Sequence, residues 1–152
     1  MPGRGWVLLD FEGEPARPLA ERRSKSSPVK DVAGMLRSFD YAAWSGVLRF
    51  AESDPGALDS LLGPALAWRD AARTAFLEEY RAAVGDCPSW PADPAEADAL
   101  VRLFVIQKLF YEVGYEAANR PTWLRIPVRG ILELFGTTRK HDQEIGGEAS
   151  NG

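Results

Sequence analysis

The chain has 152 residues, which is room for one domain with one modest hydrophobic core. An apolar fraction of 45% and a charged fraction of 26% are ordinary for a globular protein, and a formal net charge of −4 gives no electrostatic reason to expect binding to nucleic acid or to an anionic membrane. The single cysteine, Cys87, excludes an internal disulfide framework, and with one histidine, His141, it excludes a Cys/His zinc site. No apolar run is long enough for a signal-peptide core or a membrane span, so we expect a cytoplasmic protein.

The first predicted element is a short β-strand over residues 5–11. Its apolar side chains lie between a Pro-Gly turn at residues 2–3 and a Gly-Glu-Pro sequence at residues 13–15, which would end the strand. A lone strand leaves backbone N–H and C=O groups unpaired on both edges. We therefore expect this strand to be the remnant of a hairpin whose partner lies upstream of Met1.

Helices are predicted for most of the remaining chain. The first begins near Ser27, a suitable N-cap, followed by Pro28 at the first helical position, where no N–H donor is needed. Apolar residues then recur at spacings of three and four as far as Val47, so one face should be buried. A second helical region covers residues 57–84, and we expect an interruption at residues 63–64 because a proline there removes a backbone hydrogen bond.

The third helical region, residues 95–118, is the most hydrophobic. Its apolar residues cover nearly the whole circumference, so we expect this helix to be central. A short helix over residues 127–135 closes the fold, and the polar, glycine-rich residues 137–152 are typical of a disordered tail. The sequence thus predicts a mainly α fold in which residues 1–136 form one lobe.

The tetrapeptide Asp10-Phe11-Glu12-Gly13, at the end of the predicted strand, admits two interpretations. Asp and Gly are common turn formers, so the tetrapeptide can simply be a strand that runs into a tight turn. A carboxylate at a strand end beside a glycine is also where kinase-type folds hold Mg²⁺, a hard cation that prefers oxygen ligands. Four residues do not decide between the two.

A longer context indicates a family. The stretch "LLDFEGEPARPLAERRSKSSPVKDVAGMLRSFDYAA", residues 8–43, and the stretch "FYEVGYEAANRPTWLRIPVRGI", residues 110–131, closely resemble the maltokinases. These are kinases of aminoglycoside-phosphotransferase-like fold that use ATP to make maltose 1-phosphate, and some are fused to trehalose synthase. Residues 49–98 match only in helical character. The resemblance implies the helical C-terminal lobe of a protein-kinase-like fold, with a role in glycogen and trehalose metabolism.

The resemblance also implies roles for residues near the N-terminus. Asp10 falls on the Asp that holds Mg²⁺ against the ATP phosphates. Glu12 points the same way if the strand persists, so it is a second metal ligand, a group that supports the first, or the end of the turn. Arg22 and Arg23 lie in the loop that follows. They can contact phosphate or acidic side chains bidentately, or they can be solvated loop charges.

Asp31, at the start of the first long helix, has two interpretations. A negative charge in the first turn is favoured by the helix dipole, which is a sufficient structural reason for an Asp there. In kinases of this fold the Asp at the corresponding place resembles an anchor that accepts hydrogen bonds from the backbone of the catalytic loop. We favour the anchor because the residues that follow match the family well.

The third helix carries polar side chains that are candidates for sugar binding. Tyr111 and Tyr115 lie four residues apart and so share one row of the helix, with Glu112 in the adjacent row. Aromatic faces combined with a few charged partners are typical of a sugar pocket, and Arg129 can reach the same pocket. The alternative is that both tyrosines are half-buried core residues with hydrated hydroxyl groups.

Some parts of a kinase are not found in this sequence. The family's "HGDLH"-type loop, whose Asp is the catalytic base, and the nucleotide-binding lobe would both precede Met1, and His141 lies in no matching motif. We therefore expect no maltokinase activity from this chain alone, and we expect the missing portion to act in cis, in trans or through a trehalose synthase module. Two alternatives are a non-catalytic helical interaction domain on a kinase scaffold and a kinase for another small hydroxylated substrate.

Overall fold

The computed structural model describes residues 18–23, 25–85 and 87–148, with side chains up to residue 136 except those of Glu21 and Arg22. In this part of the chain four long helices follow one short helix, and no strand occurs. The elements are α1 (Leu19–Arg22), α2 (Val29–Ser53), α3 (Ala57–Val84), α4 (Pro94–Asn119), η1 (Pro121–Trp123) and α5 (Arg125–Glu148). The predicted mainly α fold is confirmed, whereas the strand predicted for residues 5–11 lies outside the described residues.

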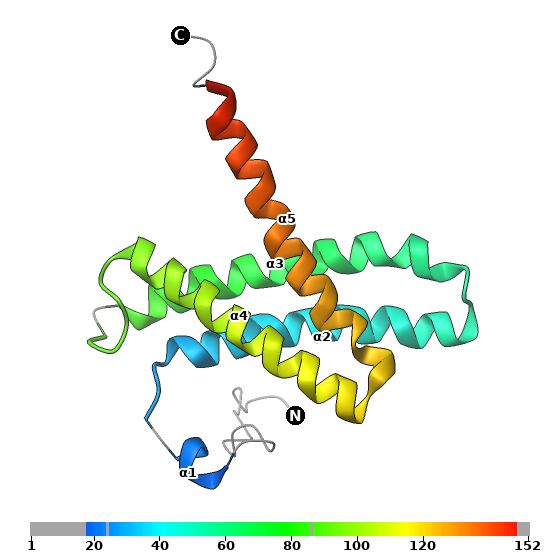
Figure 1. The fold of residues 1–152 in the computed structure, drawn as a ribbon, viewed down its shortest axis with the longest axis horizontal. Coiled ribbons are helices and arrows are strands. Elements are labelled where there is room, and N and C mark those ends of the chain that lie inside the picture. Colours follow the sequence, from blue (N-terminus) through cyan, green and yellow to red (C-terminus); the bar gives the residue numbers. More distant parts are fainter. Residues whose placement is uncertain (1–17, 24, 86, 149–152) are drawn as a thin grey trace, which may run out of the picture.

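Helix α2 is the centre of the arrangement. Figure 1 shows α2 and α3 side by side as an antiparallel hairpin, with α4 packed along α2 and α5 crossing over α2 and α3 in this view. Helix α2 contacts α3, α4 and α5, whereas α4 contacts α2, α5 and η1. Helix α4 is not buried all round as its hydrophobicity led us to expect, because Leu103 and Phe110 on α4 are 57% and 60% exposed. Apolar residues around the whole circumference of a helix therefore do not show that the other helices surround it.

The core forms where α2 meets α4. Four buried residues of α2 recur at spacings of three, one and three, and three buried residues of α4 recur every fourth position, so each helix presents one continuous apolar stripe. Burial of each such side chain stabilises the fold by roughly 1.5–3 kcal/mol for a valine or leucine. The members are Val29, Val32, Ala33, Leu36, Val101, Val105 and Leu109.

Polar residues set where α2 and α4 begin. The Ser27 hydroxyl accepts a hydrogen bond from the Val29 N–H at 3.3 Å, which confirms the predicted helix start near Ser27. At α4 a carboxylate oxygen of Asp93 accepts from the Ala95 N–H at 2.8 Å, and Pro94 occupies the first helical position. Each cap satisfies an N–H group that the helix itself leaves without a partner.

The interruption predicted within α3 is wrong, because the helix runs without a break from Ala57 to Val84 with Pro64 inside it. Pro64 removes the hydrogen bond to the Ser60 carbonyl oxygen four residues earlier. Ser60, Gly63 and Pro64 are all exposed, so water can hydrate that carbonyl group. The cost of the proline is therefore small enough for α3 to remain continuous.

Helix α5 is longer than the predicted helix over residues 127–135. It begins at Arg125, and its second half projects beyond the other helices as far as Glu148 (Figure 1). The predicted tail, residues 137–152, overlaps this half, and the division of the chain at residue 136 stays a prediction. No helix among the described residues is both long enough and apolar enough to span a membrane.

Candidate functional site

The two stretches that carry the family resemblance interlock where α2 crosses α4. Arg37 Nε donates a hydrogen bond to Glu112 Oε2 at 2.9 Å, and its Nη2 lies 2.8 Å from the same oxygen. One turn further along both helices, the Tyr41 hydroxyl donates to Glu116 Oε1 at 2.9 Å. The spacing of four on α2 matches the spacing of four on α4, so the two contacts stack one above the other.

A network of ion pairs extends from Arg37 on α2 to Arg129 on α5. Arg37 Nη1 lies 2.8 Å from Asp40 Oδ2, and Arg69 Nη1 lies 3.1 Å from Asp40 Oδ1. The same Arg69 nitrogen lies 3.0 Å from Glu133 Oε2, and Arg129 Nε lies 3.2 Å from Glu133 Oε1. The network therefore joins α2, α3 and α5, and the Arg37–Glu112 pair extends it to α4.

Several of these charges lie inside the protein. Arg37 and Asp40 are each 3% exposed, Glu112 5% and Arg69 7%. Burial raises the pKa of Glu112, and the adjacent Arg37 guanidinium offsets part of that rise. Removing one member of such a pair leaves an uncompensated buried charge, at a cost of about 3–5 kcal/mol.

Gly130 on α5 makes room for the Arg37 guanidinium. A Cβ atom at residue 130 would lie 2.7 Å from Leu109 Cδ2 and 3.0 Å from Arg37 Nη1. The first distance is shorter than real Cβ contacts, and the second is tighter than nearly all of them. The absence of a side chain here lets α5 pass close to the buried pair of α2 and α4.

Four aromatic rings form a half-buried surface, here called the aromatic surface, from Tyr41, Tyr111, Tyr115 and Trp123. Tyr111 stacks on Tyr115 with ring centroids 6.2 Å apart, and Tyr41 stacks on Trp123 with centroids 6.1 Å apart. Arg120 joins the two stacks, because its Cζ lies 5.6 Å from the Tyr115 centroid and 4.7 Å from the Trp123 centroid. Such cation–π contacts add about 0.5–2 kcal/mol.

Glu116 fixes the position of the aromatic surface. This side chain is 1% exposed and accepts two hydrogen bonds from Arg120, at 2.9 and 2.7 Å, in addition to the one from Tyr41. Burial and the nearby carboxylates raise the pKa of Tyr41 well above its ordinary value, so its hydroxyl remains a donor. The carboxylate thus holds both the arginine and one ring of the surface.

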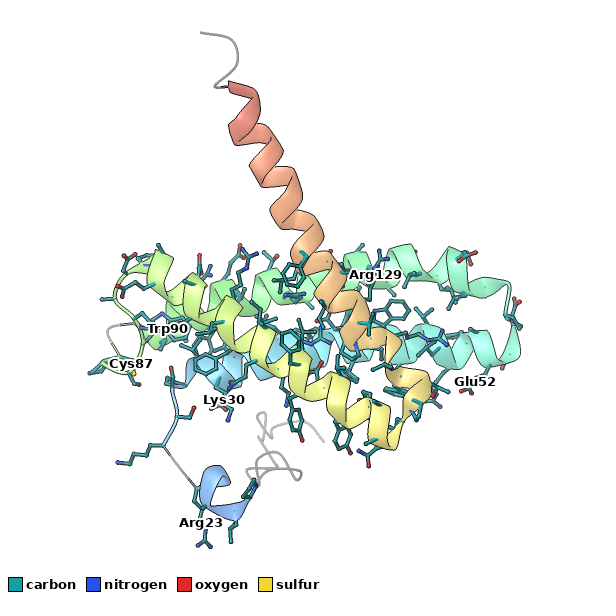
Figure 2. All side chains as sticks on the ribbon, viewed as in Figure 1. Arg23, Lys30, Glu52, Cys87, Trp90 and Arg129 are labelled. Atoms are coloured by element: carbon teal, nitrogen blue, oxygen red, sulfur yellow. The ribbon has the colours of Figure 1, made fainter. Side chains whose placement is uncertain are left out.

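The structure brings together some of the predicted sugar-site residues and separates others. Tyr111 and Tyr115 lie together on the aromatic surface. The carboxylate of Glu112 faces Arg37 in the interior, and Arg129 lies on α5 (Figure 2), where it pairs with Glu133. Sugar binding by these residues stays a prediction.

The other predicted site residues lie at or beyond the edge of the described part. Asp31 is exposed in the first turn of α2, where the helix dipole favours its charge, and its role as an anchor for a catalytic loop stays a prediction. Arg23 is exposed just after α1 (Figure 2), and the Arg22 side chain lies outside the described part. Asp10 and Glu12 lie outside it as well.

Among the described residues, no group of three or more His, Cys, Asp or Glu side chains is placed to hold a metal ion. The two carboxylates that the family resemblance assigns to Mg²⁺ precede residue 18, where the description begins. The Mg²⁺ site therefore stays a prediction.

Sequence reasoning missed Tyr41, Arg120 and Trp123, which complete the aromatic surface and its support. In the structure α4 ends at Asn119, and Arg120 directly after it contacts Glu116, Tyr115 and Trp123. The sequence contains a spacing that could have indicated this pairing. Arg37 and Tyr41 are four residues apart, and so are the two glutamates that they contact.

Comparison with known proteins points to sugar kinases. The chain is 27% identical over 130 residues to a protein named glucosamine kinase from Streptacidiphilus jiangxiensis, and this match covers 86% of the chain and 27% of the relative. It is 30% identical over 135 residues to a glucosamine kinase from Mycolicibacterium smegmatis, a match that covers 88% of the chain and 31% of the relative. The chain thus spans less than a third of the length of these relatives. No protein-family model matches it.

These similarities support a kinase-like family at most. The choice of acceptor sugar is a separate question.

Proposed function

We propose that this chain is the C-terminal helical part of an ATP-dependent sugar kinase that transfers the γ-phosphoryl group to maltose and forms maltose 1-phosphate. The observation that carries the proposal is the interlocking of the two maltokinase-like stretches. Arg37 and Tyr41 in the first stretch contact Glu112 and Glu116 in the second, across 75 positions of sequence. The residues by which the chain resembles the family are therefore residues that hold α2 and α4 together.

In this proposal the aromatic surface binds the sugar. Tyr111 and Tyr115 offer aromatic faces and hydroxyl groups, and Arg120 beside them offers N–H donors at the edge of the rings. Sugar rings bind to such surfaces through their C–H faces and hydroxyl groups. Glu116 keeps Arg120 in place, so the surface is largely preformed and loses little entropy when the sugar binds.

The remaining chemistry is assigned to residues near the N-terminus and to further polypeptide. Asp10, with Glu12, would hold Mg²⁺, which neutralises charge on the ATP phosphates when bound. Asp31 at the start of α2 would accept hydrogen bonds from the loop that carries the catalytic base. That base and the nucleotide-binding lobe would be supplied in cis or in trans, for example by a polypeptide that also contains a trehalose synthase module.

Glucosamine is the second candidate acceptor, because the two curated relatives are named glucosamine kinases. An ammonium group on the sugar would require a carboxylate close to the aromatic surface. Glu112 and Glu116 both lie beside it, but each is 5% exposed or less and already paired with an arginine. The paired state of these carboxylates favours a neutral acceptor.

Direct binding to the 152-residue chain tests the proposed site. Maltose and glucosamine are titrated separately while the aromatic resonances of the tyrosines and Trp123 are followed by NMR. We expect maltose to shift the Tyr111, Tyr115 and Trp123 resonances in a saturable way, and Tyr115→Leu to weaken the effect while Tyr80→Leu, on α3, leaves it unchanged. Saturable shifts with glucosamine alone would favour the second candidate, and no shift with either sugar would contradict the proposed site.

A further inference from the structure

A cavity of about 590 Å³ lies among α2, α3, α4 and α5, apart from the aromatic surface. Its volume is within the range of about 300–1,000 Å³ that is typical of small-molecule sites. Val105, Leu109 and Leu134 form the apolar part of the lining, and six charged side chains and two glycines form the rest. None of the four aromatic residues of the aromatic surface lines this cavity.

Three arginines in the lining converge on one buried carboxylate. Arg37 and Arg69 lie 2.8 and 3.1 Å from the oxygens of Asp40, and Arg73 Nη1 lies 3.6 Å from Asp40 Oδ2. The Arg73 distance exceeds that of a good hydrogen bond, and its side chain is 31% exposed. Its planar fork of N–H donors is therefore available to a ligand in the cavity.

Acceptors lie opposite these donors. Glu133 and Asp70, both in the lining, have side chains that are 31% and 62% exposed. Arg69 contacts one oxygen of each carboxylate, and Arg129 Nε contacts the other oxygen of Glu133 at 3.2 Å. An ionised carboxylate has about four lone-pair sites, so each retains capacity to accept further hydrogen bonds.

The charges of the lining identify the class of ligand. Three arginines are matched by three carboxylates, so the lining has no net charge that would favour an anion or a cation. A purely apolar ligand would remove water from Arg73, Glu133 and Asp70 without replacing their hydrogen bonds, which is costly. A neutral compound with many hydroxyl groups satisfies both the donors and the acceptors.

We propose that this cavity is a second binding site of the chain, for a neutral polyhydroxyl compound of about the size of a hexose. Vicinal hydroxyl oxygens accept from the Arg73 guanidinium, whose two parallel N–H groups match such a pair. Hydroxyl protons are donated to Glu133 and Asp70, and the C–H face of the ligand packs on Leu109 and its apolar neighbours. This site is independent of the proposed kinase function and of its acceptor site.

Methyl NMR of the whole 152-residue chain tests the proposal. Glucose and inorganic phosphate are titrated separately into protein with labelled valine and leucine methyl groups. We expect glucose to shift the methyl resonances of Val105, Leu109 and Leu134 in a saturable way, with no such effect from phosphate. Arg73→Leu removes charge-assisted hydrogen bonds and should weaken glucose binding about tenfold or more. Arg49→Leu, an exposed arginine of α2 outside the lining, is the matched control and should bind as the unmodified chain does.

Each other outcome overturns the proposal. If phosphate shifts these methyl resonances and glucose does not, the cavity binds anions and not polyhydroxyl compounds. If glucose causes no methyl shift up to its solubility limit, the cavity does not bind this class of ligand. If Arg73→Leu perturbs the fold, Asp70→Asn provides the second variant, because its side chain is largely exposed. Glucose binding unchanged in both variants contradicts the assignment. If glucose leaves these methyl resonances unchanged and shifts the aromatic resonances of Tyr111 and Tyr115 in a parallel titration, the cavity is excluded and the proposed acceptor site is supported.

Discussion

Gly130→Ala places a methyl group where the structure has no room for one. The added Cβ would lie 2.7 Å from Leu109 Cδ2 and 3.0 Å from Arg37 Nη1, so either α5 must move away or the Leu109 and Arg37 side chains must shift. Overpacking of this kind costs about 1–3 kcal/mol. Displacement of Arg37 from Asp40 and Glu112 would add part of the cost of about 3–5 kcal/mol for breaking a buried ion pair.

The expected loss of stability is measurable by thermal unfolding. For a chain of this size each 1 kcal/mol lowers the midpoint temperature by about 2–4 °C, so the overpacking alone lowers it by about 2–12 °C. Gly46→Ala is the matched control, because Gly46 is an exposed helical glycine with no atom within 4 Å of an added Cβ. That change should stabilise the chain by about 0.5–1 kcal/mol. If Gly130→Ala is as stable as Gly46→Ala, the close approach of α5 to Arg37 is refuted.

Three further predictions concern the same ion-pair network. Arg37→Leu should lower the free energy of unfolding in urea by about 3–5 kcal/mol. Adding Glu112→Leu should recover part of this loss, because the Glu112 carboxylate that Arg37→Leu leaves unpaired is then removed. An equal or greater loss in the double variant would count against the buried ion pair. Glu133→Gln should increase hydrogen exchange in α5 more than in α2, because an ion pair with Arg69 links α5 to α3; unchanged exchange in α5 would contradict this role. Burial raises the pKa of Glu112 above its ordinary value, so the folded state favours the protonated carboxyl group. The free energy of unfolding of the chain, compared with that of Glu112→Gln, should therefore fall as pH rises through the range just above 4.5. A difference that stays constant over that range would show that the pKa of Glu112 is not raised.

The parts of the fold that depend on local sequence could be predicted. Helix α2 begins where Ser27 and Pro28 indicate, and its apolar spacing marks the stripe that packs against α4. The continuity of α3 could not be predicted, because it depends on whether Pro64 faces solvent or protein. The central position of α2 could not be predicted either, since hydrophobicity alone does not tell which apolar surfaces meet.

The same division applies to the candidate site. The row of Tyr111 and Tyr115 follows from helical periodicity and is present. The orientation of Glu112 toward the interior depends on Arg37, 75 positions away in the sequence, and no local pattern specifies that pairing. Arg129 was expected to reach the pocket of the tyrosines, whereas its contact with Glu133 follows from the spacing of four within α5.

Sugar-dependent turnover tests the central claim most directly. The chain is substituted for the region that it matches in the Mycolicibacterium smegmatis relative, and ADP release by the chimera is measured with maltose and with glucosamine at saturating ATP and Mg²⁺. We predict maltose-dependent ADP release with maltose 1-phosphate as the product, and its loss in the same chimera with Asp10→Asn, because the metal offsets charge on the transferred phosphoryl group. A folded chimera that phosphorylates glucosamine and not maltose would contradict the proposed acceptor, and one that is inactive with both sugars, or equally active with Asp10→Asn, would contradict the kinase assignment.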